Sequence, residues 1–173
     1  SEKTKKDPKN PYALSKYIAM IYIQYMRKFY NLNISTGILF NHDSEFRSKN
    51  NLTKKVINYL NKNNFTKKLN LGNIDVHRDF GLAREYIVAM YKINQQKKRG
   101  DYIIARGKSV KVRDIINYAF NLKKLDYKNH TTIDKNKFSK QVLKFKSINI
   151  SKIKKINWVP KKDIFDLMDS LIK

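Results

Sequence analysis

Tyr12 and Lys16 stand four residues apart in a segment that follows Asn10-Pro11. On a helix, their side chains project from the same face, with Cβ atoms about 5–6 Å apart. An ammonium group about 4 Å from a phenolate stabilises it by about 4 kcal/mol at an effective dielectric constant of 20. A tyrosine held in this way can act as a base near neutral pH, so the pair is a candidate for taking a proton from a hydroxyl group. The structural alternative is a tyrosine on an amphipathic helix beside a surface lysine.

Other common chemistries are disfavoured by the composition. The chain has no cysteine, which excludes a disulfide framework, a zinc ribbon and a thiol nucleophile, and a reducing cytoplasm is the expected compartment. His42, His77 and His130 are scattered without the spacing of a metal site, so we expect no protein-bound transition metal. No apolar run is long enough for a membrane span.

The formal net charge of +24 is a possible signature of nucleic-acid binding. However, lysine outnumbers arginine by 31 to 7, and Asn and Ile are also abundant, as expected from AT-rich codons. Proteins that read bases concentrate arginine where bidentate contacts are needed. We therefore interpret the charge as a solvated lysine-rich surface and do not expect nucleic acid as a partner.

The elements that must position the tyrosine and lysine alternate between helices and strands. Asn10-Pro11 begins a helix over 12–30, with apolar residues around most of its circumference. A buried strand over 34–40 follows and ends in the polar turn 41–44. Further along the chain we expect helices over 51–60, 78–96, after Ser109, 151–156 and 161–172, with strands over 69–73 and 102–105. The lysine-rich stretch 123–146 shows the least sign of order, and the alternation predicts an α/β fold.

A series of short motifs along the chain resembles one family, the GDP-mannose 4,6-dehydratases, which are extended short-chain dehydrogenase/reductases. The P-Y-x-x-S-K segment around Tyr12 is typical of the wider superfamily. More specific are G-I-L-F-N-H at 37–42, L-G-N-I-D with R-D-F-G at 71–81, D-Y-I-I-A at 101–105, V-R at 112–113 and N-W at 157–158. Their order is that of the family, and they cover nearly the whole chain.

This resemblance implies the carboxy-terminal part of a Rossmann-type enzyme with its small substrate-binding domain. Residues 1–50 would end the NAD(P)-binding domain, and residues 51–173 would be mostly the nucleotide-sugar-binding region. The implied activity is that of a lyase, which converts GDP-mannose to GDP-4-keto-6-deoxymannose on the way to GDP-fucose. A hydride moves from C4 to NADP, water is lost across C5–C6, and the hydride returns to C6; NAD is a possible substitute for NADP.

The family's functional residues map onto particular positions of this sequence. By resemblance, Tyr12 is the base for the sugar 4-hydroxyl, and Lys16 activates it and holds the nicotinamide ribose. His42 and Arg47 match positions that contact NADP. The positions near the nucleotide sugar, where cations suit a diphosphate, are those of Asn41, Lys55 and Arg78.

Two departures from the family accompany the resemblance. The sequence contains no glycine-rich dinucleotide turn, and the family's catalytic threonine and glutamate also precede the matched segment. We therefore expect a chain that lacks the amino-terminal cofactor-binding part and is inactive alone. Ser139 and Val142 stand where the family carries an arginine and a glutamate for the nucleotide sugar.

Two alternatives remain open at the level of sequence. A nucleotide-sugar epimerase or reductase shares the tyrosine and lysine but needs no elimination base. A non-catalytic basic module for interaction or nucleic-acid binding would keep only the fold. Whether the protein is a dehydratase or an epimerase or reductase, the helix 12–30 has more apolar surface than one contact within the chain can bury. We therefore expect a homo-oligomer paired through this helix.

Overall fold

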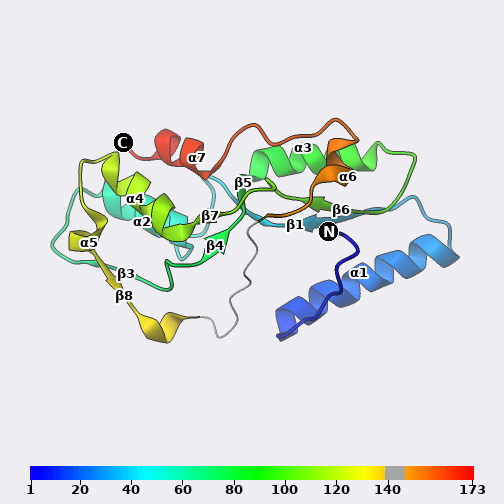
Figure 1. Cartoon of the computed structure of the whole chain (residues 1–173), viewed down its shortest axis with the longest axis horizontal. Coiled ribbons are helices and arrows are strands. Elements are labelled where there is room, and N and C mark those ends of the chain that lie inside the picture. Colours follow the sequence, from blue (N-terminus) through cyan, green and yellow to red (C-terminus); the bar gives the residue numbers. More distant parts are fainter. Residues whose placement is uncertain (139–146) are drawn as a thin grey trace.

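The structure, a computed structural model, describes residues 1–138 and 147–173. Two lobes lie side by side, and the long helix α1 (Pro11–Phe29) lies below one of them (Figure 1). Each lobe has its own cluster of buried hydrophobic side chains. The described strands pair two by two, and helices and strands alternate, so the predicted α/β class is confirmed.

The first lobe is built on the parallel pair β1 (Thr36–Leu39) and β6 (Asp101–Ile104). Helices α3 (Ala83–Asn94) and α6 (Ser151–Lys154) lie on one side of this pair, and α1 lies on the other (Figure 1). Strand β6 is apolar on both faces because both are covered. The buried core consists of Tyr86, Ala89, Ile93, Tyr102, Ile103, Ile104, Ala105, Ile148, Ile150, Ile153 and Trp158.

The second lobe packs helices α2 (Leu52–Asn61), α4 (Val112–Asn121) and α7 (Ile164–Leu171) around one core. The short helix α5 (Tyr127–His130) leads into a parallel pair of β3 (Leu69–Leu71) and β8 (Thr131–Ile133), and a 3-10 turn, η1, follows at Lys135–Lys137. The amphipathic helices α2, α4 and α7 supply most of the buried side chains, which include Val56, Leu60, Ile115, Ile116, Phe120, Ile164 and Met168.

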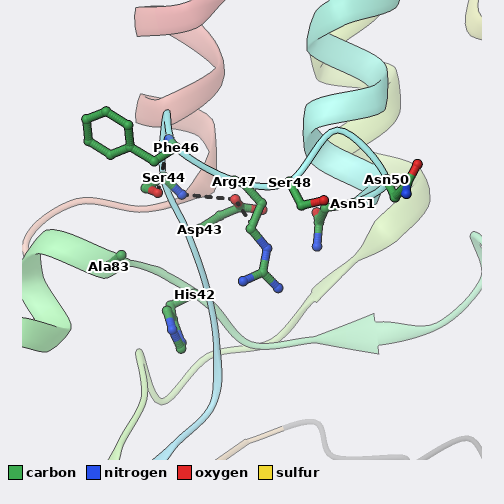
Figure 2. A pocket seen from close by; sticks show the side chains of 9 residues that line it. All are labelled: His42, Asp43, Ser44, Phe46, Arg47, Ser48, Asn50, Asn51 and Ala83. Atoms are coloured by element: carbon green, nitrogen blue, oxygen red, sulfur yellow. Dashed lines mark hydrogen bonds and ion pairs between the residues drawn. The ribbon is translucent and has the colours of Figure 1, made fainter.

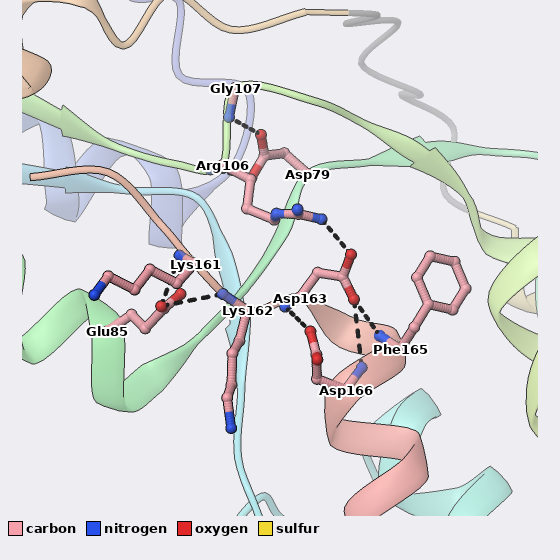
Figure 3. A network of polar contacts seen from close by, with 9 residues as sticks. All are labelled: Asp79, Glu85, Arg106, Gly107, Lys161, Lys162, Asp163, Phe165 and Asp166. Carbon is pink, nitrogen blue, oxygen red and sulfur yellow. Dashed lines mark hydrogen bonds and ion pairs between the residues drawn. The ribbon is translucent and has the colours of Figure 1, made fainter.

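Two more strand pairs and a polar network connect the lobes. Strand β2 (Asn41–Asp43) runs parallel to β5 (Phe80–Leu82), and β4 (His77–Arg78) pairs antiparallel with β7 (Val110–Lys111). Between β4 and β5, the buried carboxylate of Asp79 accepts hydrogen bonds from the backbone N–H groups of Arg106 at 2.8 Å and Gly107 at 2.7 Å. The Arg106 guanidinium pairs at 2.6 Å with Asp163, the N-cap of α7 (Figure 3). The network thus ties the β6–β7 turn to both lobes.

Helix α1 is attached to the first lobe through a narrow face. Asn10 caps it by accepting the Ala13 N–H at 2.8 Å, and Gln24 and Arg27 bond to Asp101 at 2.6 and 2.9 Å. Burial disfavours the charge on Asp101, but the hydrogen bonds from Arg27 and Gln24 keep its pKa below the usual value. The opposite face exposes a continuous apolar stripe, hereafter the α1 stripe, made of Leu14, Ile18, Ile21, Tyr22, Tyr25 and Phe29.

Within the described residues, no helix has the length and apolar character needed to cross a membrane.

Most predicted elements are confirmed, but the boundaries fail where strands are formed by distant pairing. The helix expected over 78–96 begins only at Ala83, because the preceding residues pair with β7 and β2. The turn expected over 41–44 is largely strand β2 for the same reason. The helix expected after Ser109 begins at Val112, because Val110–Lys111 forms β7, and Lys111 stands at its N-cap position without a side-chain hydrogen bond to the helix.

The lysine-rich stretch from residue 123 shows the least sign of order in the sequence, yet its described part forms regular elements. Tyr127 is buried in the second lobe's core and begins α5, and Thr131–Ile133 pairs with β3. Local composition hides both contacts because their partners lie far away in the sequence.

Candidate active site

A pocket of about 560 Å³ lies beside the carboxyl end of β1 and is the candidate binding site. Strand β2 and the loop that follows form most of it, and the amino end of α3 closes one side (Figure 2). Its lining residues are His42, Asp43, Ser44, Phe46, Arg47, Ser48, Asn50, Asn51 and Ala83.

The loop that forms the pocket is anchored by a buried carboxylate. Asp43 is 2% exposed and accepts hydrogen bonds from the Thr53 hydroxyl and from the Ser44 N–H, the latter at 2.9 Å. Thr53 lies in the first turn of α2, which Asn51 caps. The pair therefore holds both ends of the loop in place, since a buried carboxylate is costly without such partners.

The pocket is suited to an anionic ligand. The Arg47 side chain is 44% exposed, and its Nε is 3.9 Å from Asp43, a long contact that leaves most of its donors open with respect to residues 1–138 and 147–173. In Figure 2 the Arg47 side chain extends downward from the loop, whereas the Phe46 ring projects to the left. Ala83 is the first residue of α3, and Leu82 before it has no side-chain oxygen that could cap the helix.

Tyr12 and Lys16 lie together on α1, as their spacing predicts. The Lys16 ammonium is 5.5 Å from the centroid of the Tyr12 ring, a cation–π arrangement. Tyr12 is 72% exposed in the first turn of the helix. Neither residue is among those that line the pocket around Arg47.

The three predicted nucleotide-sugar residues lie on separate elements outside that pocket. Asn41 begins β2, Lys55 is half-buried on α2, and Arg78 lies on β4 opposite Val110. One guanidinium nitrogen of Arg78 donates to the His77 carbonyl at 2.8 Å. Strand β2 thus carries one predicted contact of the nucleotide sugar, Asn41, directly before one predicted contact of the cofactor, His42.

Ser139 and Val142 lie outside the described residues. Across residues 1–138 and 147–173, no group of histidine, aspartate or glutamate side chains could hold a metal ion.

Several residues that shape the site were missed by sequence reasoning. Asp43 and Thr53 are ten residues apart, and Asp79 reaches the turn at residues 106–107. Tyr86 lies behind β2, with its hydroxyl 3.4 Å from the Asn41 carbonyl oxygen. The sequence carries a signal for two of these residues, because Asp43 lies in the polar turn after a predicted strand and Asp79 lies in the R-D-F-G motif. The contacts that they make depend on tertiary packing.

Comparison with known protein families gives one consistent result. The family described as GDP-mannose 4,6 dehydratase matches residues 1–171. GDP-mannose 4,6 dehydratase 1 from Arabidopsis thaliana is 38% identical over 164 residues, which cover 93% of this chain and 45% of the relative. The chain therefore spans about half the length of this curated relative.

Solved structures show the same fold at lower sequence identity. RMD from Pseudomonas aeruginosa, complexed with NADPH, aligns with a TM-score of 0.85 at 18% identity over 99% of this chain and 57% of that one. The dTDP-glucose 4,6-dehydratase from Bacillus anthracis, in complex with NAD, gives 0.86 at 18% identity over 99% and 54%. The fold is therefore that of about half of an extended dehydratase or epimerase.

Proposed function

Because the chain belongs to the GDP-mannose 4,6-dehydratase family, we propose that it acts in the dehydration of GDP-mannose to GDP-4-keto-6-deoxymannose. The match over residues 1–171 carries this proposal, since it includes the tyrosine and lysine on α1. The glycine-rich turn that is not in this sequence would come from the rest of a longer protein, and this chain would be inactive without it.

Tyr12 is the proposed base for the sugar 4-hydroxyl. In the structure Tyr12 is 72% exposed at the start of α1, and the Lys16 ammonium lies 5.5 Å from the centroid of its ring. Lys16 is also the proposed donor to the nicotinamide ribose.

His42 and Arg47 are the proposed cofactor contacts, with NADP favoured and NAD as the alternative. The residues present fit one part of such a molecule, because an exposed guanidinium and an uncapped helix end face the same pocket as an imidazole. When bound, the nicotinamide supplies a reversible hydride acceptor. The structural relatives with NADPH and NAD support this choice.

Asn41, Lys55 and Arg78 are the proposed contacts for the nucleotide sugar. Two of them are cations, which suit a diphosphate, and among the described residues the Arg78 guanidinium donates through one nitrogen, to the His77 carbonyl. We propose that residues 1–50 complete the cofactor domain and that residues 51–173 mostly bind the sugar nucleotide.

The α1 stripe supports a homo-oligomer of the whole protein. Its six side chains recur at spacings of three and four residues, so they form one face of the helix, and each is at least 44% exposed. A second copy of the same helix would cover this face isologously.

The test is to join the preceding half of the Arabidopsis relative to Ser1 and to measure conversion of GDP-mannose by the fusion. We expect GDP-4-keto-6-deoxymannose as the product, and a loss of at least 100-fold in kcat in Tyr12→Phe with binding of GDP-mannose retained. Tyr17→Phe, a half-buried tyrosine on the same helix, is the matched control and should keep its activity. Equal activity in Tyr12→Phe and wild type would refute the assignment, and an epimerised or reduced sugar would favour the alternative enzymes.

A further inference from the structure

Gly81 leaves room for an aromatic ring beside His42. The two residues are register partners in the parallel pair β2–β5. A Cβ atom on Gly81 would lie 2.7 Å from both Cζ and the hydroxyl oxygen of Tyr86, closer than packed atoms can approach. The missing side chain is therefore a steric requirement of Tyr86, whose ring occupies the space next to His42.

Tyr86 is fixed on all sides. It is 1% exposed, and its ring centroid lies 5.2 Å from that of His42 and 6.1 Å from that of Trp158. Its hydroxyl lies 3.4 Å from the carbonyl oxygen of Asn41. Burial raises the pKa of the Tyr86 phenol, and the nearby carboxylate of Asp79 raises it further, so the hydroxyl remains a neutral donor.

The hydrogen bond of His42 determines which ring nitrogen carries the hydrogen. Nδ1 lies 2.9 Å from the Phe40 carbonyl oxygen. Because a carbonyl oxygen can only accept, Nδ1 must be the protonated nitrogen, and in the neutral ring Nε2 is left as an acceptor. His42 lines the pocket, so this tautomer determines what the pocket can recognise.

We propose that Tyr86 is a positioning residue for His42: it holds the imidazole against the Phe40 carbonyl, so that Nε2 remains an acceptor for a ligand N–H or O–H group. An amide or a ribose hydroxyl of a nucleotide cofactor has this chemistry. That choice of ligand rests on the proposed function, whereas the tautomer and its dependence on Tyr86 do not.

The test uses the chain labelled with ¹⁵N-histidine, in which NMR correlations between ring nitrogens and ring protons distinguish the two tautomers of a neutral imidazole. The His42 signals are assigned with His42→Gln. We expect wild-type His42 to be in the Nδ1–H form and Tyr86→Leu to change the ratio of the two forms at least threefold. Tyr86→Phe keeps the ring and should keep the wild-type ratio.

Phe120→Leu is the matched control. Phe120 is fully buried, and its ring stacks on His130 with centroids 6.0 Å apart. This variant should change the His130 signals and leave those of His42 unchanged, whereas Tyr86→Leu should do the reverse. A wild-type His42 in the Nε2–H form overturns the proposal even if Tyr86→Leu does not fold, and so does an unchanged ratio in folded Tyr86→Leu.

NADP affinity in the fusion separates this proposal from the proposed function. A changed tautomer with at least tenfold weaker NADP binding in Tyr86→Leu supports both. A changed tautomer with unchanged affinity supports the positioning role and contradicts the cofactor contact of His42. An unchanged tautomer overturns the positioning role, whatever the affinity.

Discussion

Replacing Asp79 with asparagine should destabilise the chain at pH 7 by less than about 3 kcal/mol. The carboxylate is 2% exposed and accepts two backbone N–H groups, from Arg106 and Gly107. Asparagine keeps one acceptor oxygen, so one buried N–H loses its partner, which costs about 1–3 kcal/mol. Removing a buried charge offsets part of this cost.

The consequences of Asp79→Asn should extend beyond the turn. Gly107 adopts a left-handed conformation with φ of +87°, and Arg106 holds the N-cap of α7 through Asp163 (Figure 3). A turn that is no longer held by Asp79 should therefore weaken the contact between the lobes. Asp79→Ala, which removes both acceptors, should cost more than Asp79→Asn.

Urea unfolding followed by circular dichroism measures the effect. Asp7→Asn is the control, because Asp7 is 65% exposed and its ion pair with Lys9 should contribute less than about 0.5 kcal/mol. Equal midpoints for wild type and Asp79→Asn at pH 7 would refute the reasoning.

The difference in stability between wild type and Asp79→Asn should change with pH in a defined direction. Burial raises the pKa of Asp79, and the N–H groups of Arg106 and Gly107 only partly oppose this. The folded state therefore binds the proton more tightly than the unfolded state, and the stability linked to Asp79 increases as pH falls through the raised pKa toward about 3.9. The free energy of unfolding of wild type should increase relative to that of Asp79→Asn as the pH is lowered from 7 to 4. A relative decrease would mean that the hydrogen bonds from the N–H groups affect the pKa of Asp79 more than burial does.

Three further predictions concern pH, assembly and cofactor binding. Hydrogen bonds from Arg113 and Lys111 lower the pKa of Asp75 to about 2, so its stabilising effect should be present above about pH 4 and lost toward pH 2; Asp75→Asn should remove this part of the acid unfolding curve, and an unchanged curve would contradict it. In the fusion, Ile18→Glu with Tyr25→Glu should shift light scattering toward the monomer, whereas a monomeric unmutated fusion would show that the stripe has another cover. The chain alone should bind NADP weakly or not at all in isothermal titration, and micromolar affinity would contradict the need for a glycine-rich turn.

The sequence predicts the elements that carry strong local signals. Helix α1 follows from Asn10-Pro11 and an uninterrupted run, and β6 follows from a short apolar segment. The short strands β2, β4, β5 and β7 were missed because two or three residues carry no periodicity, and only pairing with distant residues makes them strands.

In the candidate site, too, local features are predicted from the sequence and contacts between distant segments are not. Tyr12 and Lys16 are predicted by a local helical spacing, and their contact is present. The anchoring of the pocket loop by Asp43 and Thr53, and the packing of Tyr86 over Gly81, depend on how segments far apart in sequence meet. Such contacts cannot be derived from local patterns in one sequence.

The most direct test of the central claim is isotopic. GDP-mannose carrying deuterium at C4 of the sugar is given to the fusion with the Arabidopsis half, and the product is analysed by mass spectrometry and NMR. A 4,6-dehydratase that uses Tyr12 as its base should deliver the deuterium to C6 of a 4-keto-6-deoxy sugar, and Tyr12→Phe should give no labelled product. Deuterium retained at C4 of an epimerised sugar, or a 4-keto-6-deoxy product formed equally well by Tyr12→Phe, would contradict it.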